Sequence, residues 1–583
     1  MKYELILVTK LLIIAHLRKE EHNMRTNIFK FVFFSCVIML FSNCSKEIKW
    51  HYFPKLDLIT EGQIKNDLIY LASEEMQGRE AGLAGAKLAA DFLKGELNKL
   101  DLDTLINDDG NNLNDFSQNF RILGTDLENV QSALTIDRDG EEIKAKYWED
   151  YFYFFNSPQQ VDVMGEIVFA GFAIFSPEYY YNDFKDLDLQ DKIVVAYYGE
   201  PLQNDTLLFF NGKHQTKYMM SDWKAQEVAK RGGKALILIP NPENEDSYER
   251  FLKRRIQSSR KTPFVLDTEK SVPVLYLSNS FTKRIFSNFI NKNFSSETEK
   301  LRIWLEKNNR DFFSWKGTNL DKLTWSVRIS YDDPEVRNCQ NLVALYSGNH
   351  PQLKDEFILI GSHYDHEGMR NGEVFLGADD NASGVSANLN IARAFAELTD
   401  KEKPARSVIF AFWDAEEKGT LGTKYFADHS PFPLDRIKVV FNMDMIGRDA
   451  SFNFAALRKP MIDENAENKV MIFYSAQSPE LKELAKKSNF SINLHLLYDP
   501  NVFFTSGSDH VVFHSRHIPI VFYFTGFHTD YTSLNDTPEK INFTKLTKIT
   551  RHIANFVYHL SMTEQSPGFN KKILSAPEGD FRM

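Results

Sequence analysis

The sequence predicts an α/β fold with a mostly parallel central sheet flanked by helices, together with an inserted β-rich unit. Between about residues 335 and 565, strand-like runs alternate with loops and helical segments, which is typical of a parallel sheet. Between about residues 130 and 315, short strand-like runs alternate with turn signals instead. The chain of 583 residues is also too long for one hydrophobic core, so at least two packed units are expected.

The first expected elements are helices between Leu58 and Leu102, where apolar residues mostly recur every three or four positions. The glycine-rich stretch from Gln77 to Gly85 interrupts this pattern and indicates a loop between two helices. We therefore assign residues 44–130 to the N-terminal part of the larger domain.

The inserted unit is expected at residues 131–315. Its predicted strands are bounded by turn residues, and they are Gly165–Ile174, Lys192–Gly199, Lys234–Pro240 and Val272–Ser278. A helix is expected around Trp223 to Lys230. The segment shows no pattern of metal ligands or nucleophiles, which favours a role as a lid or spacer.

The main part of the larger domain is expected at residues 316–565. Its predicted strands are Glu356–Ile360, Ser407–Trp413, Ile437–Asn442, Val470–Tyr474 and Pro519–Phe524. A helix from Gly384 to Leu398 places four apolar residues on one face, namely Val385, Leu389, Ala392 and Phe395. The tail at residues 566–583 has two prolines and scattered charges and is expected to be disordered.

Residues 1–43 are predicted to contain a signal peptide. Arg25 and Lys30 precede an apolar run from Phe31 to Phe41, which is about half the length that spans a bilayer as a helix. The following LFSNC resembles the lipobox of bacterial lipoproteins. Cys44 is therefore expected to carry a lipid that anchors an exported protein to a bacterial membrane, facing the periplasm or the exterior; an ordinary signal peptide is the alternative.

Composition excludes several classes of protein. Apolar residues at 43% and charged residues at 26% are typical of a globular protein. A net charge of -11 with mixed signs argues against a nucleic-acid partner, because phosphate binding needs clustered Lys and Arg. Three cysteines cannot form a disulfide framework, and Cys339 is expected to be a small buried residue.

Histidines and carboxylates cluster where the predicted strands end. The set comprises His363, Asp365 and His366 after the first strand, Asp379 and Asp380 before the helix, Asp414, Glu416 and Glu417 after the second strand, and Asp444 after the third. In open α/β sheets the ligand crevice lies at the carboxyl ends of the strands, so these residues can converge. Histidine together with carboxylates suits zinc, so the sequence predicts a metal site.

Four motifs contain this set, GSHYDH, GADDNASG, DAEEKG and NMDMIG. In this order they resemble the di-zinc aminopeptidases related to aminopeptidase S and aminopeptidase Y, whose clan also holds glutamate carboxypeptidase II and the transferrin receptor. The stretch LASEEMQGREAG and the inserted unit, which resembles a protease-associated domain, extend the resemblance over nearly the whole chain after residue 44. The resemblance implies the zinc-exopeptidase fold, two zinc ions and removal of N-terminal residues from peptide substrates.

The resemblance also implies metal ligands. Asp380 would bridge two zinc ions, His363 and Asp444 would complete one site, and Glu417 would serve the other. Asp379 is expected to be a loop or capping residue, because Asp380 is the one that directly precedes the NxSG pattern, and no role carries over to His366 and Asp414.

The catalytic residues that the resemblance implies are Glu416 as general base and Asp365 as acceptor of the second imidazole proton of His363. The chemistry agrees, because adjacent glutamates at a strand end can direct one carboxylate to the metal and leave the other for water. A carboxylate such as Asp365 fixes the tautomer of a ligand histidine.

One position departs from the family pattern. The final zinc-binding histidine should directly follow a tyrosine, but the segment FHTDYTSLNDT has Thr532 there. Tyr531 is retained, and in some members the matching tyrosine polarises the substrate carbonyl. The second site keeps only Asp380 and Glu417, so we expect it to be weak or empty unless His528 folds back across roughly 13 Å of chain.

Alternatives remain open at this stage. The sequence does not separate an aminopeptidase from a dipeptidase or a carboxypeptidase. The missing histidine leaves open a catalytically impaired, peptidase-like binding protein, as the transferrin receptor is on the same fold. An acyl transferase similar to glutaminyl cyclase is a third reading.

Overall fold

The computed structural model describes residues 50–105, 114–138, 140–201, 210, 216–258, 262–307, 311–450, 466–500 and 507–570. The predicted signal segment and Cys44 lie outside the described residues, as does the tail from residue 571. Within the described ranges, no helix is long and apolar enough to cross a membrane. The first part of the predicted disordered tail is packed, since the Asn570 amide donates to the Gln477 carbonyl at 2.9 Å.

The larger sheet has ten strands, and the order of nine of them is β11, β2, β14, β18, β15, β19, β22, β20 and β21, with β1 paired to β14. The bounds are β1 Asp103–Thr104, β2 Ser117–Gly124, β11 Phe264–Leu266, β14 Glu335–Tyr346, β15 Phe357–His363, β18 Ser407–Trp413, β19 Ile437–Met443, β20 Lys469–Tyr474, β21 His495–Asp499 and β22 Ile520–Phe524. All five strands predicted for the main part of this domain are therefore present.

Parallel pairing in this sheet runs through the four central strands β18, β15, β19 and β22, and it also joins β20 to β21. The remaining pairs are antiparallel. The α/β class is confirmed, but the sheet is mixed rather than mostly parallel. The difference comes mainly from β11, β2 and β14 at one side of the sheet, which were not among the predicted runs and pair in antiparallel fashion, as β20 does with β22.

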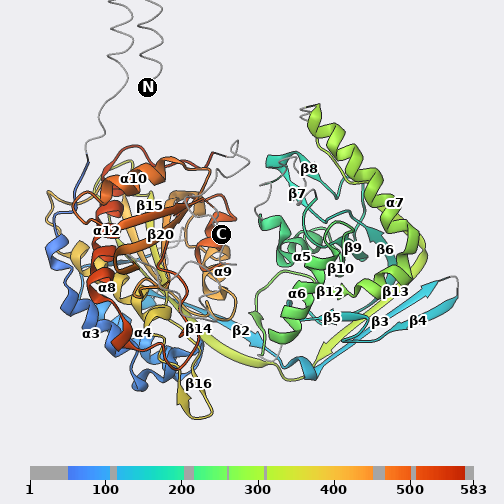
Figure 1. Cartoon of the computed structure of the whole chain (residues 1–583), viewed down its shortest axis with the longest axis horizontal. Helices are drawn as coiled ribbons and strands as arrows, with labels where there is room; N and C mark the ends of the chain where they lie inside the picture. The colour runs from blue at the N-terminus through green and yellow to red at the C-terminus, as the bar shows by residue number, and fades with distance from the viewer. Residues whose placement is uncertain are drawn as a thin grey trace, which may run out of the picture. The chain divides into compact units, whose positions relative to one another are not determined.

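Helices flank the larger sheet. The bounds are α3 Glu61–Leu71, α4 Ala84–Leu97, α8 Gly384–Ala396, α9 Leu421–Asp428, α10 Glu480–Ser488, α11 His510–His514 and α12 Phe543–Met562. Helices α3, α8 and α12 pack together, with α8 and α12 against β15, whereas α9 packs against β2 and β14 and α11 against β19 and β22 (Figure 1). The four residues predicted to share the buried face of α8 are all buried.

A second sheet has eight strands in the order β4, β3, β13, β6, β9, β10, β12 and β5. The bounds are β3 Val130–Arg138, β4 Glu141–Ala145, β5 Tyr151–Tyr153, β6 Val161–Phe169, β9 Ile193–Tyr197, β10 Ala235–Ile239, β12 Val274–Leu277 and β13 Thr318–Tyr331, and the helices are α5 Ser221–Ala229, α6 Glu245–Ser258 and α7 Asn279–Glu306. All four strands and the helix predicted for the inserted unit are present.

The boundaries of the second sheet differ from the predicted residues 131–315. Strand β13 extends the sheet to Tyr331, and its alternate residues Trp325, Val327 and Ile329 are buried, as the two-residue period of a strand requires. Strand β11 lies within the predicted range but pairs with β2 of the larger sheet.

Candidate metal centre

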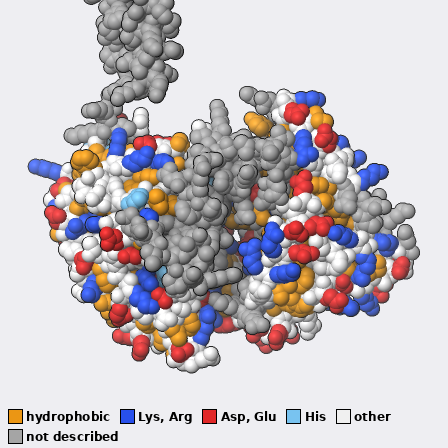
Figure 2. Space-filling model, viewed as in Figure 1, with side chains coloured by type: hydrophobic (Ala, Val, Ile, Leu, Met, Phe, Trp, Pro, Cys, Tyr) orange, Lys and Arg blue, Asp and Glu red, His pale blue; other side chains and the backbone are white. Residues whose placement is uncertain are grey.

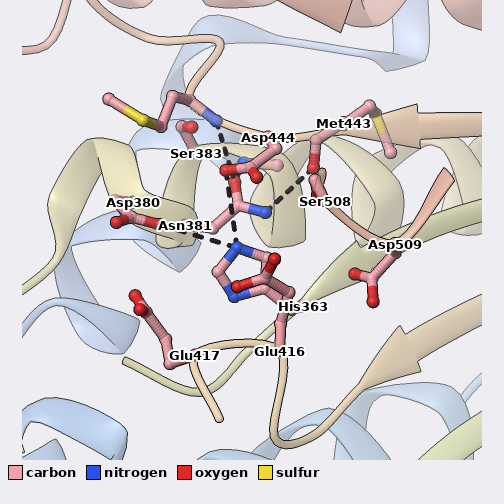
Figure 3. Close-up of polar contacts among 12 residues, drawn as sticks. His363, Asp380, Asn381, Ser383, Glu416, Glu417, Met443, Asp444, Ser508 and Asp509 are labelled. Carbon is pink, nitrogen blue, oxygen red and sulfur yellow. Dashed lines mark hydrogen bonds and ion pairs between the residues drawn. The ribbon is translucent and has the colours of Figure 1, made fainter. Parts of the chain in front are cut away.

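The predicted ligands lie at the carboxyl ends of three neighbouring strands. His363 is the last residue of β15, Glu417 follows β18, and Asp444 follows β19 directly. Asp380 comes from the turn Ala378–Ser383 that leads into α8. Because β15 lies between β18 and β19 in the sheet, these loops meet over one edge and bring the side chains together (Figure 3).

His363, Asp380 and Asp444 form a first group that can hold a metal ion. The Nε2 atom of His363 lies 3.5 Å from Oδ1 of Asp380 and 3.4 Å from Oδ1 of Asp444 (Figure 3). Two ligands of a tetrahedral zinc ion, each about 2.1 Å from it, are roughly 3.4 Å apart, so the spacing fits one ion. Among the described residues, His363 Nε2 and Asp444 Oδ1 have no hydrogen-bond partner although both are buried. A metal ion would satisfy both atoms.

His366, Asp380 and Glu417 form a second group. The Nδ1 atom of His366 lies 3.1 Å from Oε1 of Glu417 and 3.7 Å from Oδ2 of Asp380. Asp380 thus presents one carboxylate oxygen to each group, as a bridging ligand does. His366 was not among the predicted ligands, because the family resemblance implies no role at this position.

His528, the tentative ligand of the second site, lies elsewhere. Its Nε2 atom is 3.3 Å from Oδ2 of Asp379, and it belongs to neither ligand group. Asp379 directly precedes the bridging Asp380 in the sequence, and its carboxylate also accepts the Gly447 amide at 2.7 Å. The structure therefore does not bring His528 to Glu417.

The turn that carries Asp380 is held from two sides. The carboxylate of Asp536, which is fully buried, accepts the backbone amides of Asp379 at 3.0 Å and of Asp380 at 3.1 Å. The side chain of Asn381 donates to the carbonyl of Met443 at 2.9 Å (Figure 3). The bridging carboxylate and the loop of Asp444 are thereby fixed to one another. Asp536 was not among the predicted site residues, although it lies in the segment FHTDYTSLNDT.

Asp365 orients the two glutamates. Its carboxylate accepts the amides of Glu416 at 3.0 Å and Glu417 at 3.2 Å. The Nδ1 atom of His363 lies closer to the backbone oxygen of Asp365, at 3.2 Å, than to its carboxylate, at 3.6 Å. The predicted contact with the imidazole is therefore made mainly by the main chain, and the carboxylate positions the loop after β18.

The centre concentrates negative charge in a buried volume. Burial raises the pKa of Asp380 well above its usual range, and the neighbouring carboxylates of Glu417 and Asp444 raise it further. Burial likewise raises the pKa of Glu416. For His363, burial alone would lower the pKa, but the charges of Asp444 and Glu416 raise it well above the usual value. A bound cation would relieve this repulsion.

Tyr531, a predicted catalytic residue, is half-buried beside Phe527, with ring centroids 5.8 Å apart. Burial, followed by the charges of Asp380 and Glu417, raises the pKa of its hydroxyl well above the usual range. The hydroxyl is therefore a proton donor at neutral pH.

Asp509 is a candidate that sequence reasoning left without a role. It is buried near Glu416 (Figure 3), accepts a hydrogen bond from the Thr423 hydroxyl, and its charge raises the pKa of Glu416. Burial raises the pKa of Asp509 itself to about 7. The other unassigned carboxylate, Asp414, accepts the amides of Gln340 and Ala415 and so supports the loop after β18.

Comparison with known proteins agrees with this chemistry. Residues 341–557 match peptidase family M28. A stretch of 147 residues, 24% of this chain and 27% of the relative, is 33% identical to the probable leucine aminopeptidase 2 of Aspergillus oryzae. A stretch of 307 residues, 47% of this chain and 37% of the relative, is 24% identical to the glutamate carboxypeptidase 2 homolog of Caenorhabditis elegans. The matches thus span about a quarter to a third of these relatives' length.

Among solved structures, an aminopeptidase from Aneurinibacillus sp. strain AM-1 is similar with a TM-score of 0.44 and 19% identity, covering 88% of this chain and 96% of that chain. Residues 341–557 are therefore similar to peptidase family M28, and this segment contains every residue of both ligand groups.

Proposed function

We propose that this protein is a zinc-dependent aminopeptidase that removes N-terminal residues from peptides. The observation that carries the proposal is the first ligand group, in which His363, Asp380 and Asp444 have the spacing of zinc ligands at a buried site. The match to family M28 and the names of relatives, which include leucine aminopeptidases, support a peptidase.

Glu416 is proposed as the general base. It belongs to neither ligand group, yet its charge acts on His363 and Asp380, so its carboxylate is free to face a water molecule at the centre. Zinc held by the first group would lower the pKa of that water to about 7 and polarise the scissile carbonyl. Glu416 then accepts the proton of the water and delivers it to the leaving amine.

Two further residues support this step. Asp365 fixes the amide of Glu416 and so sets the direction of its side chain. The protonated hydroxyl of Tyr531 donates a hydrogen bond to the substrate carbonyl oxygen as negative charge develops on it.

A cavity of about 380 Å³ offers space for the substrate. Its lining includes Glu417 and Lys418 from the loop after β18. It also includes Phe154, Arg255 and Phe264 from the inserted segment. We propose that peptide side chains occupy this cavity and that the inserted unit, which resembles a protease-associated domain, limits their size. We also propose that Cys44 is lipidated and anchors the exported enzyme to a bacterial membrane.

The proposal is tested with purified protein on aminoacyl p-nitroanilides, N-acetylated peptides and peptides with N-terminal glutamine, each with and without a zinc chelator. We expect chelator-sensitive release of N-terminal residues and no cleavage of acetylated substrates. Cleavage of acetylated peptides from the C-terminus would show a carboxypeptidase, and cyclisation of glutamine an acyl transferase. A protein that binds no zinc and cleaves nothing would be the impaired binding protein, the candidate that Thr532 favours.

A further inference from the structure

The second ligand group takes its histidine from a loop where the family resemblance assigns none. Thr532 occupies the position of the expected histidine, but His366, in the loop after β15, faces Glu417 and Asp380 with its Nδ1 atom at 3.1 Å and 3.7 Å. These distances bracket the roughly 3.4 Å between two ligands of a tetrahedral zinc ion. We infer that His366 supplies the histidine ligand of a second zinc ion. For the identity of the metal, this inference rests on the proposed function.

The surroundings of the imidazole ring leave it this role. The His366 side chain is fully buried, and among the described residues its Nε2 atom has no hydrogen-bond partner. The polar contacts recorded for the ring are therefore those of Nδ1 with the two carboxylates. Nδ1 is therefore the ring atom that faces both carboxylates, and a metal ion held between the three groups would replace the hydrogen bond between Nδ1 and Glu417.

The ring is also fixed in direction by the backbone beneath it. Gly377 has a φ of +57°, and a Cβ atom there would lie 2.5 Å from Cδ2 and 2.6 Å from Cγ of His366. The imidazole thus packs directly on the backbone that leads into the turn of Asp380. This contact requires glycine and directs Nδ1 toward the second group.

Arg79 holds the loop that carries His366. The His366 amide donates to the Arg79 carbonyl at 3.0 Å. The buried guanidinium of Arg79 donates to the carbonyls of Tyr364 at 2.8 Å, Leu376 at 2.8 Å and Gly377 at 2.9 Å, which lie at the two ends of the loop. The glycine-rich stretch before α4 therefore orders the loop before metal binds, so that little conformational entropy is lost on coordination. With His366, the second site has three protein ligands, the usual complement of catalytic zinc.

Zinc binding separates this inference from its alternatives. We expect the purified protein, equilibrated in zinc-buffered solution, to hold two zinc ions by elemental mass spectrometry. His366→Ala should keep one tightly and bind the second at least about 100-fold more weakly, because the loss of a group that only orients a ligand already costs about 10- to 100-fold. The matched control His528→Ala should keep both. Two tight ions in His366→Ala, or only one in the natural protein, would overturn the inference.

A second variant covers the case in which His366→Ala does not fold. In His366→Cys the sulfur lies one bond closer to Cβ than Nδ1 does, and the Zn–S distance of about 2.3 Å exceeds the Zn–N distance of about 2.0–2.1 Å, so a thiolate can reach the same ion. Loaded with cobalt, this variant should show a thiolate-to-metal charge-transfer band that the natural protein lacks, and absence of the band in the folded, loaded variant would contradict the assignment. If the metal results hold but no peptide is cleaved, the proposed function fails and the ligand assignment stands.

Discussion

Replacing Glu416 by glutamine removes the proposed base while leaving the metal ligands in place. Glu416 is in neither ligand group, and its backbone amide, which Asp365 holds at 3.0 Å, is unchanged by the substitution. We therefore expect both metals to remain bound. General acid-base catalysis contributes about 10²- to 10⁴-fold, so kcat should fall by that factor, which corresponds to about 2.7–5.4 kcal/mol in the activation barrier.

The assay compares kcat and KM on leucine p-nitroanilide with zinc content measured on the same samples. A fall in kcat at constant zinc content and nearly constant KM is the expected result, because the base acts only in the transition state. The matched control Glu417→Gln should differ by losing zinc from the second site. An unchanged kcat in Glu416→Gln, or loss of zinc from it, would refute the assignment of the base.

Asp365, Arg255 and Cys44 provide three further tests. Asp365→Asn leaves one side-chain acceptor for the two amides of Glu416 and Glu417. It should therefore weaken zinc affinity or kcat by about 10- to 100-fold. If neither quantity changes in zinc titrations and kinetics, Asp365 only fills the loop. Arg255→Ala, at the wall of the cavity, should raise KM about tenfold or more for peptides long enough to contact it, because a hydrogen bond to a charged group is worth about 1.5–3 kcal/mol. The zinc content should not change. An Arg255→Ala variant whose KM rises equally for short and long peptides would contradict this prediction. Cys44→Ser should abolish labelling by a fatty-acid analogue during growth while export continues, and label that persists in the mutant would reject the lipid anchor.

The metal centre could be predicted from the sequence because the patterns that mark it are local. Strands β15, β18 and β19 are short, mostly apolar and almost entirely buried, and a polar motif follows each of them. Their order along the chain was therefore enough to bring His363, Glu417 and Asp444 together. Helix α8 likewise has a periodic apolar face, and its predicted and observed bounds differ by two residues at the C-terminal end.

The second histidine could not be predicted in this way. The position of His366 depends on Arg79, which lies 287 residues earlier in the chain, and on the absence of a side chain at Gly377. Such contacts between distant segments leave no periodic pattern. Reasoning along the segment itself led to His528, whose ring lies on Asp379 instead.

The edges of the two sheets were missed for a related reason. Strand β13 pairs with β3 and β6 of the second sheet, although nothing in its sequence distinguishes it from β14, which follows after a three-residue connection and joins the larger sheet. Partner choice between two sheets is decided by tertiary packing, which strand propensity does not report.

The most direct test of the account is a crystal structure of the zinc-loaded protein with anomalous data collected at the zinc edge. We predict two anomalous peaks that share Asp380, one about 2.0–2.1 Å from Nε2 of His363 and the other at the same distance from Nδ1 of His366. A single peak, or a second peak coordinated by His528 in place of His366, would contradict the account.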